Sequence, residues 1–152
     1  MARVSTYLNF PGTTEAAFAF YRSVFGTEYV GPVLRFGDLP ETADGLDEAD
    51  RGLVLHIELP ILGGHLIMGT DHIAAAGHEM VAGTNVSINL EPDSIEEGRA
   101  LFELLSEGAA DAVPLQPMPW GAWWTSFVDR FGLRWMINVP DGGAQPESSV
   151  PA

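Results

Sequence analysis

The chain of 152 residues is 46% hydrophobic, which is typical of a globular protein that is long enough to bury a core. Its 21 acidic and 7 basic residues give a formal net charge of −14 at pH 7, and this charge repels phosphate backbones, so we expect no nucleic-acid partner. The chain has no cysteine, which excludes disulfides and thiolate metal sites and suits a reducing compartment.

No segment of the sequence is typical of a signal peptide or a membrane span. The first ten residues contain no long apolar stretch, and no run approaches the ~18 apolar residues needed to cross a bilayer. We therefore expect a cytoplasmic protein without a membrane partner.

The first half of the chain is predicted to fold as a strand, a helix and three further strands. Residues 5–10 alternate as a strand does, and apolar residues then recur at helical spacing over 13–25, with a threonine cap in front and Gly26 as a stop. The further strands are expected at 30–36, 53–59 and 66–68. The acidic loop 38–50 lacks the ligand pattern of a calcium loop, so we interpret it as a solvated insertion.

The second half repeats this order. Residues 85–90 alternate, and Asp93 and Ser94 open a helix with Glu96 and Glu97 placed for a capping box. Gly108 is expected to end this helix. Three more strands are expected at 112–116, 123–129 and 134–139. The tail 140–152 is polar and rich in proline and glycine, so we expect a mobile end without a role in the fold.

Matching residues support an internal repeat. Asn9 and Asn89 are 80 residues apart, and so are Thr14 and Ser94. The chain is thus predicted to be an α+β protein of two βαβββ modules, about 5–70 and 85–139, within one domain over 1–139.

Three segments carry a resemblance to a known family. They are YLNFPGTTEAAFAFYRSVFGTE at residues 7–28, LHIELPILGGHLIMGTD at 55–71 and WGAWWTSFVDRFGLRWMINV at 120–139. Together they resemble the PhnB-like family of the vicinal oxygen chelate superfamily, which includes glyoxalases, bleomycin resistance proteins and ring-cleavage dioxygenases. The resemblance implies paired βαβββ modules whose curved mixed sheets form a cup for a ligand, often with a metal ion, and it implies a homodimer.

Strand alternation divides each predicted sheet into two faces. Thr6, Leu8 and Phe10 are expected to pack on the first helix. On the second helix we expect Val86, Ile88 and Leu90 from one strand and Trp135, Ile137 and Val139 from another. Arg134 is expected near the rim of the cup. The residues predicted to bind a ligand on the other face are Tyr7, Asn9, Asn85, Ser87, Asn89, Trp124, Met136 and Asn138.

These residues are polar, aromatic or thioether groups without charge. Such groups orient a small molecule and leave no unpaired charge buried, which favours a binding pocket. The alternative is a solvated sheet face. Trp123 and Trp124 are adjacent in a strand, so their rings must point to opposite faces, and one of them is free to stack on a ligand or to enter a subunit interface.

The resemblance also indicates which positions would carry the ligands of a metal ion. Metal-dependent members of the superfamily carry histidine or glutamate ligands at positions that correspond here to Ser5, Met68, Asn85 and Met136. None of these side chains is a usual ligand for Zn²⁺, Ni²⁺ or Fe²⁺. We therefore expect neither a metal ion nor another cofactor.

Two functions stay open at this stage. The first is a protein that binds a small organic molecule in the cup. The second is a glyoxalase- or dioxygenase-type enzyme, either metal-dependent through other ligands or using His56 and Glu58, which share a strand face, as an acid/base pair. A solvated strand face is the alternative for this pair, and His72 and His78 are expected in a connecting loop that has a surface or lid role.

Overall fold

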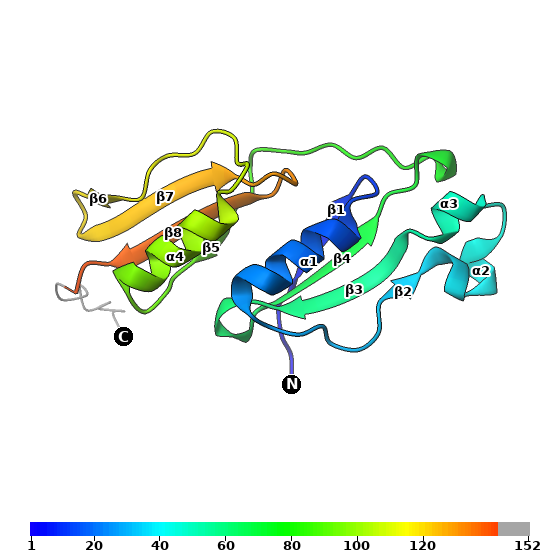
Figure 1. Cartoon of the computed structure of the whole chain (residues 1–152), viewed down its shortest axis with the longest axis horizontal. Coiled ribbons are helices and arrows are strands. Elements are labelled where there is room, and N and C mark those ends of the chain that lie inside the picture. The colour runs from blue at the N-terminus through cyan, green and yellow to red at the C-terminus, as the bar shows by residue number, and fades with distance from the viewer. Residues whose placement is uncertain (143–152) are drawn as a thin grey trace, which may run out of the picture. The chain divides into compact units, whose positions relative to one another are not determined.

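The chain divides into two compact units, Met1–Gly83 and Thr84–Ala152, of which the computed structural model describes residues 1–142. Each unit begins with a strand, continues with one long helix and ends with three strands (Figure 1). The division falls between the two predicted modules. That residues 1–139 form a single domain stays a prediction.

The first unit contains the longer set of elements. Its long helix and strands are β1 (Thr6–Phe10), α1 (Thr14–Phe25), β2 (Leu34–Arg35), β3 (Val54–Pro60) and β4 (Leu66–Asp71). Its short helices are η1 (Phe36–Asp38), α2 (Pro40–Ala43), α3 (Glu48–Arg51), η2 (Leu62–Gly64) and η3 (Ala74–Ala76). The acidic loop is therefore folded into short helical turns.

The second unit has the same order with fewer insertions. Its elements are β5 (Ile88–Leu90), α4 (Ile95–Leu105), β6 (Gln116–Met118), β7 (Ala122–Val128) and β8 (Arg134–Pro140). The Ser94 hydroxyl accepts a hydrogen bond from the Glu97 backbone N–H at 3.1 Å, and the Glu97 carboxylate accepts one from the Asp93 N–H at 3.0 Å. This is close to the predicted capping box.

Both units have the same sheet topology, which confirms the α+β fold of two βαβββ modules. Within the described residues the strands form two four-stranded sheets, in the orders β1-β4-β3-β2 and β5-β8-β7-β6. In each sheet the first and last strands of the unit pair in parallel, and the other neighbours are antiparallel. The internal strands are therefore β4 and β3 in one sheet and β8 and β7 in the other.

The core of the first unit lies between α1 and one face of its sheet. Phe18 and Tyr21 of α1 are fully buried, as are Ile57 and Ile67 of the sheet within 1%. Gly69 allows the close approach, because a Cβ atom at this position would lie 2.5 Å from a carbon of the Phe18 ring. The packing thus depends on a glycine at the centre of β4.

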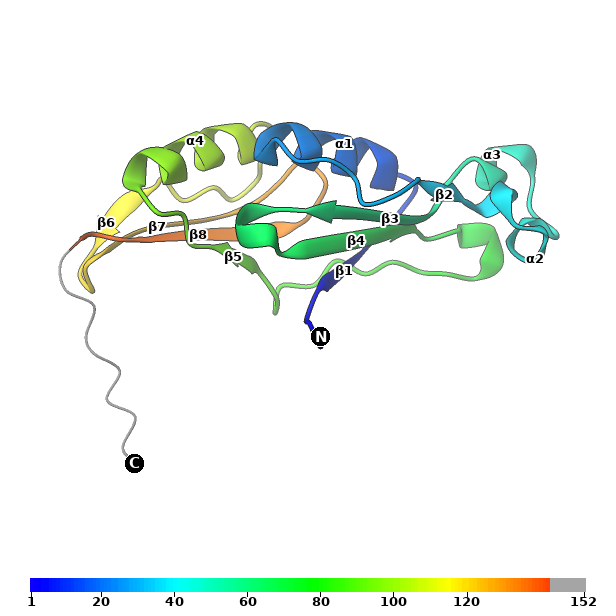
Figure 2. The same ribbon diagram turned by 90° about the horizontal axis from the view of Figure 1, so that it is seen from below.

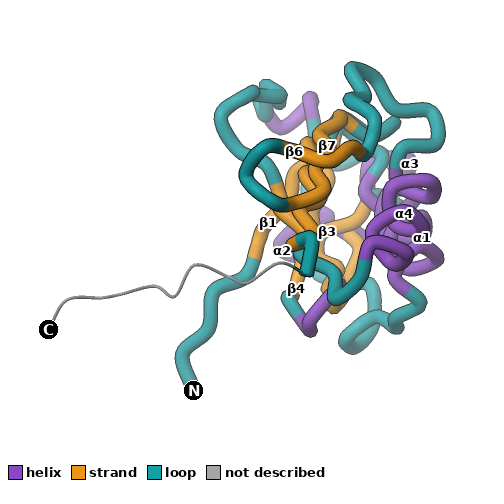
Figure 3. The backbone as a smooth tube through the Cα atoms, turned by 90° about the vertical axis from the view of Figure 1, so that its left-hand side faces the viewer, coloured by secondary structure: helices purple, strands orange, loops and turns teal. Residues whose placement is uncertain are grey.

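The core of the second unit lies between α4 and its sheet. Gly98 of α4 lies against Ile137 and Val139 of β8, and a Cβ atom there would be 2.8 Å from Val139. Trp135 and Leu105 are fully buried on the same side. In each unit the long helix covers one face of the sheet (Figures 2 and 3), and we call the opposite face the helix-free face.

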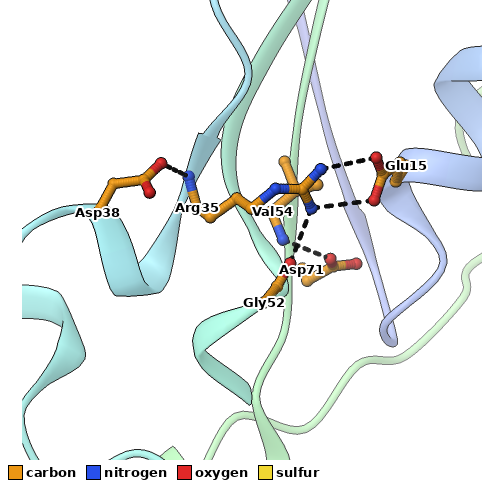
Figure 4. A network of polar contacts seen from close by, with 6 residues as sticks. All are labelled: Glu15, Arg35, Asp38, Gly52, Val54 and Asp71. Carbon is orange, nitrogen blue, oxygen red and sulfur yellow. Dashed lines mark hydrogen bonds and ion pairs between the residues drawn. The ribbon is translucent and has the colours of Figure 1, made fainter. Parts of the chain in front are cut away.

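A buried carboxylate ties the elements of the first unit together. Asp71, at the end of β4, accepts hydrogen bonds from the Thr14 N–H at 3.0 Å, the Thr14 hydroxyl at 2.7 Å and the Val54 N–H at 2.9 Å. Thr13 is the N-cap residue of α1, as the predicted threonine cap requires, but its side chain makes no capping hydrogen bond. Figure 4 shows Asp71 beside Arg35, whose guanidinium is held by both oxygens of Glu15.

Four predicted strands differ by several residues from the strands of the structure. The strand predicted at 30–36 is reduced to Leu34–Arg35, although the Val30 and Phe36 N–H groups also donate to backbone carbonyls of Glu58 and Leu53. The strand predicted at 66–68 extends to Asp71, the one predicted at 85–90 begins at Ile88, and the one predicted at 112–116 is Gln116–Met118. Val86 therefore does not pack on the helix and is 69% exposed. The tail predicted at 140–152 begins inside β8 at Pro140, and its residues 143–152 lie outside the described part of the chain.

Candidate functional site

The helix-free face of the first sheet is built around Met68. The strand register places Tyr7 of β1 beside Met68 of β4, and Met68 beside Glu58 of β3. Asn9 and His56 lie on the same face one step further along their strands, since strand residues two apart share a face. Tyr7 and Asn9 are exposed, whereas Met68, His56 and Glu58 are half-buried.

A hydrogen-bonded chain crosses this face above Met68. The Tyr7 hydroxyl lies 3.1 Å from His56 Nδ1, and His56 Nε2 lies 2.9 Å from Glu58 Oε1. A carboxylate only accepts, so His56 donates from Nε2; in the neutral imidazole Nδ1 then accepts from the Tyr7 hydroxyl. The predicted pair of His56 and Glu58 thus lies together, and Tyr7, predicted as a ligand-binding residue, joins it.

The surroundings of Tyr7 keep its phenol protonated. Partial burial raises the pKa of Tyr7 above its ordinary value, and the negative charge of Glu58 raises this pKa further. The Tyr7 proton is engaged with His56 while the hydroxyl oxygen keeps acceptor capacity. Near neutral pH Tyr7 is therefore a neutral hydroxyl group and not a phenolate.

The helix-free face of the second sheet is built around Met136 in a similar way. Met136 of β8 lies beside Asn89 of β5 on one side and Ser126 of β7 on the other. The next pair along the sheet is Asn138 and Trp124. Four predicted ligand-binding residues, Asn89, Trp124, Met136 and Asn138, therefore share this face.

The two adjacent tryptophans point to opposite faces, as predicted from strand alternation. Trp123 pairs with Val139 on the helix side, and the Arg99 guanidinium of α4 lies 4.8 Å from the centre of its ring. Trp124 pairs with Asn138 on the helix-free face. Of the two, Trp124 is therefore the one that lies on the helix-free face with the other candidate residues.

The other candidate residues are placed differently. Asn85 and Ser87 are exposed and precede β5, so they extend the line of Asn89 without belonging to the sheet. His65 is hydrogen-bonded to the Thr6 hydroxyl at 2.9 Å at the start of β4. His72 and His78 follow β4 with ring centres 5.4 Å apart, within the connecting loop that the sequence indicated.

Comparisons with known proteins cover nearly the whole chain. The structure of protein PA1353 from Pseudomonas aeruginosa is similar, with 33% sequence identity and a TM-score of 0.78 over 92% of this chain and 98% of that one. Protein YjdN from Escherichia coli strain K12 is 27% identical over 143 residues, which cover 90% of this chain and 94% of YjdN. The PhnB protein from Bacillus cereus is 24% identical, with a TM-score of 0.72 over 91% of this chain and 99% of that one. The chain belongs to the PhnB-like family of the vicinal oxygen chelate superfamily.

This membership agrees with the fold, since the structures that it resembles include glyoxalase and bleomycin resistance proteins. No family model matches the chain. The similarity to PA1353 and YjdN covers both modules of this PhnB-like chain, as the three sequence segments do.

The superfamily implies a metal ion, and the residues of this PhnB-like chain do not fit one. FosX, a fosfomycin resistance protein from Listeria monocytogenes that has the same fold at 16% identity and a TM-score of 0.61, was solved with Mn(II) in a mutant form. Mn²⁺ prefers carboxylate, carbonyl and water oxygens, whereas Met68 and Met136 offer thioethers at two expected ligand positions. Within residues 1–142 no three histidine or carboxylate side chains lie together as ligands for one ion. A metal-free protein stays a prediction.

Proposed function

We propose that this chain binds a small organic molecule on the helix-free faces of its sheets. The observation that carries the proposal is the contrast between the two faces. The helix sides are buried and apolar, whereas each helix-free face surrounds a half-buried methionine with polar and aromatic side chains. In the first unit these include the hydrogen-bonded pair of His56 and Glu58. A surface that served only solvation would not need Trp124, Met68 and Met136 there.

The chemistry of these groups suits a mixed ligand. Asn89, Asn138 and Ser126 offer both hydrogen-bond donors and acceptors, while Trp124 and Met136 offer flat or flexible apolar contact. A ligand with a ring or short aliphatic body and a few polar groups fits this set. Binding sites for small molecules commonly combine an apolar lining with few orienting polar groups.

A second candidate function is acid–base catalysis without a metal, and the chain of Tyr7, His56 and Glu58 favours it. If Tyr7 takes a proton from a bound molecule, its own proton passes to His56 Nδ1, and Glu58 stabilises the imidazolium through Nε2. The raised pKa of Tyr7 disfavours a free phenolate, so the relay requires Tyr7 to gain the proton of the bound molecule as it gives its own proton to His56. This hypothesis of an enzyme concerns the first unit alone.

Thermal stability in the presence of a metabolite library tests the binding proposal. A compound that binds the folded chain raises the unfolding midpoint, because it stabilises the folded state by mass action. Replacing Asn89 by Leu should weaken binding of the best compound about ten-fold, as expected for the loss of a hydrogen bond worth ~1–2 kcal/mol, while the fold remains intact.

The matched control is the neighbouring Leu90→Asn, which buries an unpaired amide on the helix side, where Leu90 is 3% exposed. It should lower the unfolding midpoint in the absence of ligand. The assignment of faces fails if Asn89→Leu unfolds the protein and Leu90→Asn does not.

The same best compound separates the binder from the enzyme. Incubation with the wild-type chain and with His56→Ala, followed by mass spectrometry of the compound, shows whether it is converted. Conversion by the wild type that is lost in His56→Ala supports catalysis, whereas an unchanged compound that still raises the midpoint supports a binding protein.

The location and partners of the chain remain predictions. No helix among residues 1–142 is long and apolar enough to cross a membrane. A cytoplasmic location and the lack of a nucleic-acid partner rest on the absence of cysteine and on the net charge of −14.

A further inference from the structure

The arginines of the chain differ in how their charges are used. All seven basic residues are arginines, and three of them, Arg22, Arg35 and Arg130, form ion pairs with glutamates. Arg99 lies over the Trp123 ring. Only Arg35 and Arg134 are half-buried, and Arg35 is neutralised by both oxygens of Glu15.

Arg134 has no such partner. Its Nε atom is buried, and it has no hydrogen-bond or ion-pair partner among residues 1–142. Guanidinium groups stay charged at all ordinary pH values, so the charge cannot be removed by losing a proton. A half-buried cation without a counterion costs free energy. The lack of an acidic partner among the described residues is unusual in a chain that has 21 acidic and 7 basic residues.

The strand register places Arg134 on the proposed binding face. Arg134 begins β8 and alternates with Trp135, which is buried on the helix side. It therefore shares the helix-free face with Met136 and Asn138, and it lies opposite Val128 of β7. The strand residues around it on this face, Asn89, Ser126 and Val128, carry no charge.

We infer that Arg134 binds the oxyanion of a small organic acid, a carboxylate or a phosphate ester, whose apolar body lies over Met136 toward Trp124. The inference rests on the proposed function and names the ligand class of that site. A guanidinium offers a planar fork of N–H donors that matches the oxygens of either group. The anion supplies the counterion that the described chain does not.

The spacing along β8 supports a ligand of modest size. Met136 and Asn138 follow Arg134 at every second position, so successive side chains on this face are roughly 7 Å apart. An aromatic or short aliphatic acid bound at Arg134 reaches Met136, and a polar substituent on it reaches Asn138 or Trp124. Larger polyanions are disfavoured by the overall negative charge.

Nuclear magnetic resonance of the arginine Nε–H groups tests the inference at the atom concerned. Benzoate and phenyl phosphate are titrated as probes at constant ionic strength, with benzamide as the neutral analogue. The Arg134 Nε–H resonance should shift and saturate with at least one of the two acids, and the better one distinguishes a planar from a tetrahedral oxyanion. Benzamide should bind at least ten-fold more weakly, because it lacks the charge-assisted hydrogen bonds.

Variants separate ligand binding from a structural role. Arg134→Gln should weaken binding of the acid about ten-fold or more without lowering the unfolding midpoint, because an unpaired charge is removed. Arg134→Lys should retain part of the affinity, and Arg99→Gln, which lies on the helix side, should retain all of it.

Three results would overturn the inference: no saturable shift with either acid, equal binding of benzamide, or unchanged affinity in Arg134→Gln. A lower unfolding midpoint of Arg134→Gln together with unchanged acid binding would assign Arg134 to the fold. If benzamide or a library compound still binds the helix-free face independently of Arg134, the ligand class is wrong and the proposed function stands.

Discussion

The Glu58 carboxylate determines which atoms carry the protons in the hydrogen-bonded chain of Tyr7, His56 and Glu58. Glu58 fixes the His56 tautomer with Nδ1 free to accept, and this leaves the Tyr7 hydroxyl as the group that faces outward. His56 and Glu58 are two residues apart, so alternation predicts their shared face. Tyr7 is 49 residues away from His56, and the two meet only because β1 and β3 both pair with β4.

The first prediction concerns the charge of Glu58. Burial is the larger cause of the raised Tyr7 pKa, and the Glu58 carboxylate is the smaller one. Glu58→Gln removes the charge and keeps the size, so the Tyr7 pKa should fall and remain above its ordinary value. The ¹³Cζ chemical shift of Tyr7 as a function of pH measures this. A pKa that rises or stays the same would show that Glu58 does not act on Tyr7 through its charge.

The second prediction concerns Asp71. Asp71→Ala leaves three buried donors on Thr14 and Val54 unpaired and should lower the free energy of unfolding by about 3 kcal/mol. Urea unfolding measures the loss. Asp44→Ala changes an exposed carboxylate and serves as the control with little expected effect. Equal stability of the two variants would contradict the role of Asp71 as the cap of α1.

At the scale of elements, each long helix approaches its sheet closely at a glycine. This glycine belongs to the strand in the first unit and to the helix in the second. In the first unit Gly69 of the strand receives Phe18 of the helix, whereas in the second unit Gly98 of the helix receives Val139 of the strand. The helix therefore lies close enough to bury the apolar side of the strands. The other side is left for the polar residues of the candidate site.

The third prediction follows from this close approach. Gly69→Ala places a methyl group 2.5 Å from a Phe18 ring carbon and should lower the free energy of unfolding by about 1–3 kcal/mol. In a Phe18→Leu background the same change should cost less, because the shorter side chain makes room. Chemical unfolding of the four variants gives the coupling. An equal cost in both backgrounds would show that Phe18 is not what Gly69 accommodates.

The sequence predicts the elements whose hydrophobic periodicity is strong. It does not predict contacts between residues that are far apart along the chain. Both long helices and the strands β1, β3, β7 and β8 follow from local patterns, and so does the opposite orientation of Trp123 and Trp124. The alternation of 85–90 starts before Ile88, the first residue that pairs with β8, so Val86 is exposed although its pattern predicts burial.

Buried carboxylates show the limit of local patterns most clearly. Asp71 caps a helix that begins 57 residues earlier, and Asp129 accepts from the Trp135 indole N–H and from the N–H groups of Phe131 and Leu133 in its hairpin. Each looks like a surface residue in the sequence. The unpaired charge of Arg134 likewise emerges only when its neighbours across the sheet are known.

At the scale of the whole molecule, the fourth prediction is that purified protein contains no stoichiometric transition metal. The reason is the thioether chemistry of Met68 and Met136, which stand at two positions where the family resemblance implies metal ligands. Elemental analysis of protein prepared without chelators measures the content. One equivalent of zinc, nickel, manganese or iron, retained through dialysis, would contradict the prediction.

The fifth prediction is a homodimer. The family resemblance implies a homodimer, and Trp120 and Val86 are 63% and 69% exposed in this chain. Light scattering at micromolar concentration should give about twice the monomer mass of 16.4 kDa. Trp120→Ser should shift the mass toward the monomer if this ring lies in the interface, and a monomer mass for the wild type would refute the dimer.

The central claim is that ligands bind on the helix-free faces, and methionine methyl resonances test it most directly. The chain has five methionines, of which Met68 and Met136 lie at the centres of those faces, while Met1 and Met80 lie outside the sheets. With ¹³C-methyl methionine and the best compound from the stability screen, saturable shifts are expected at Met68, Met136 or both, and none at Met1 or Met80. Shifts confined to Met1 or Met80, with Met68 and Met136 unchanged at saturation, would contradict the account.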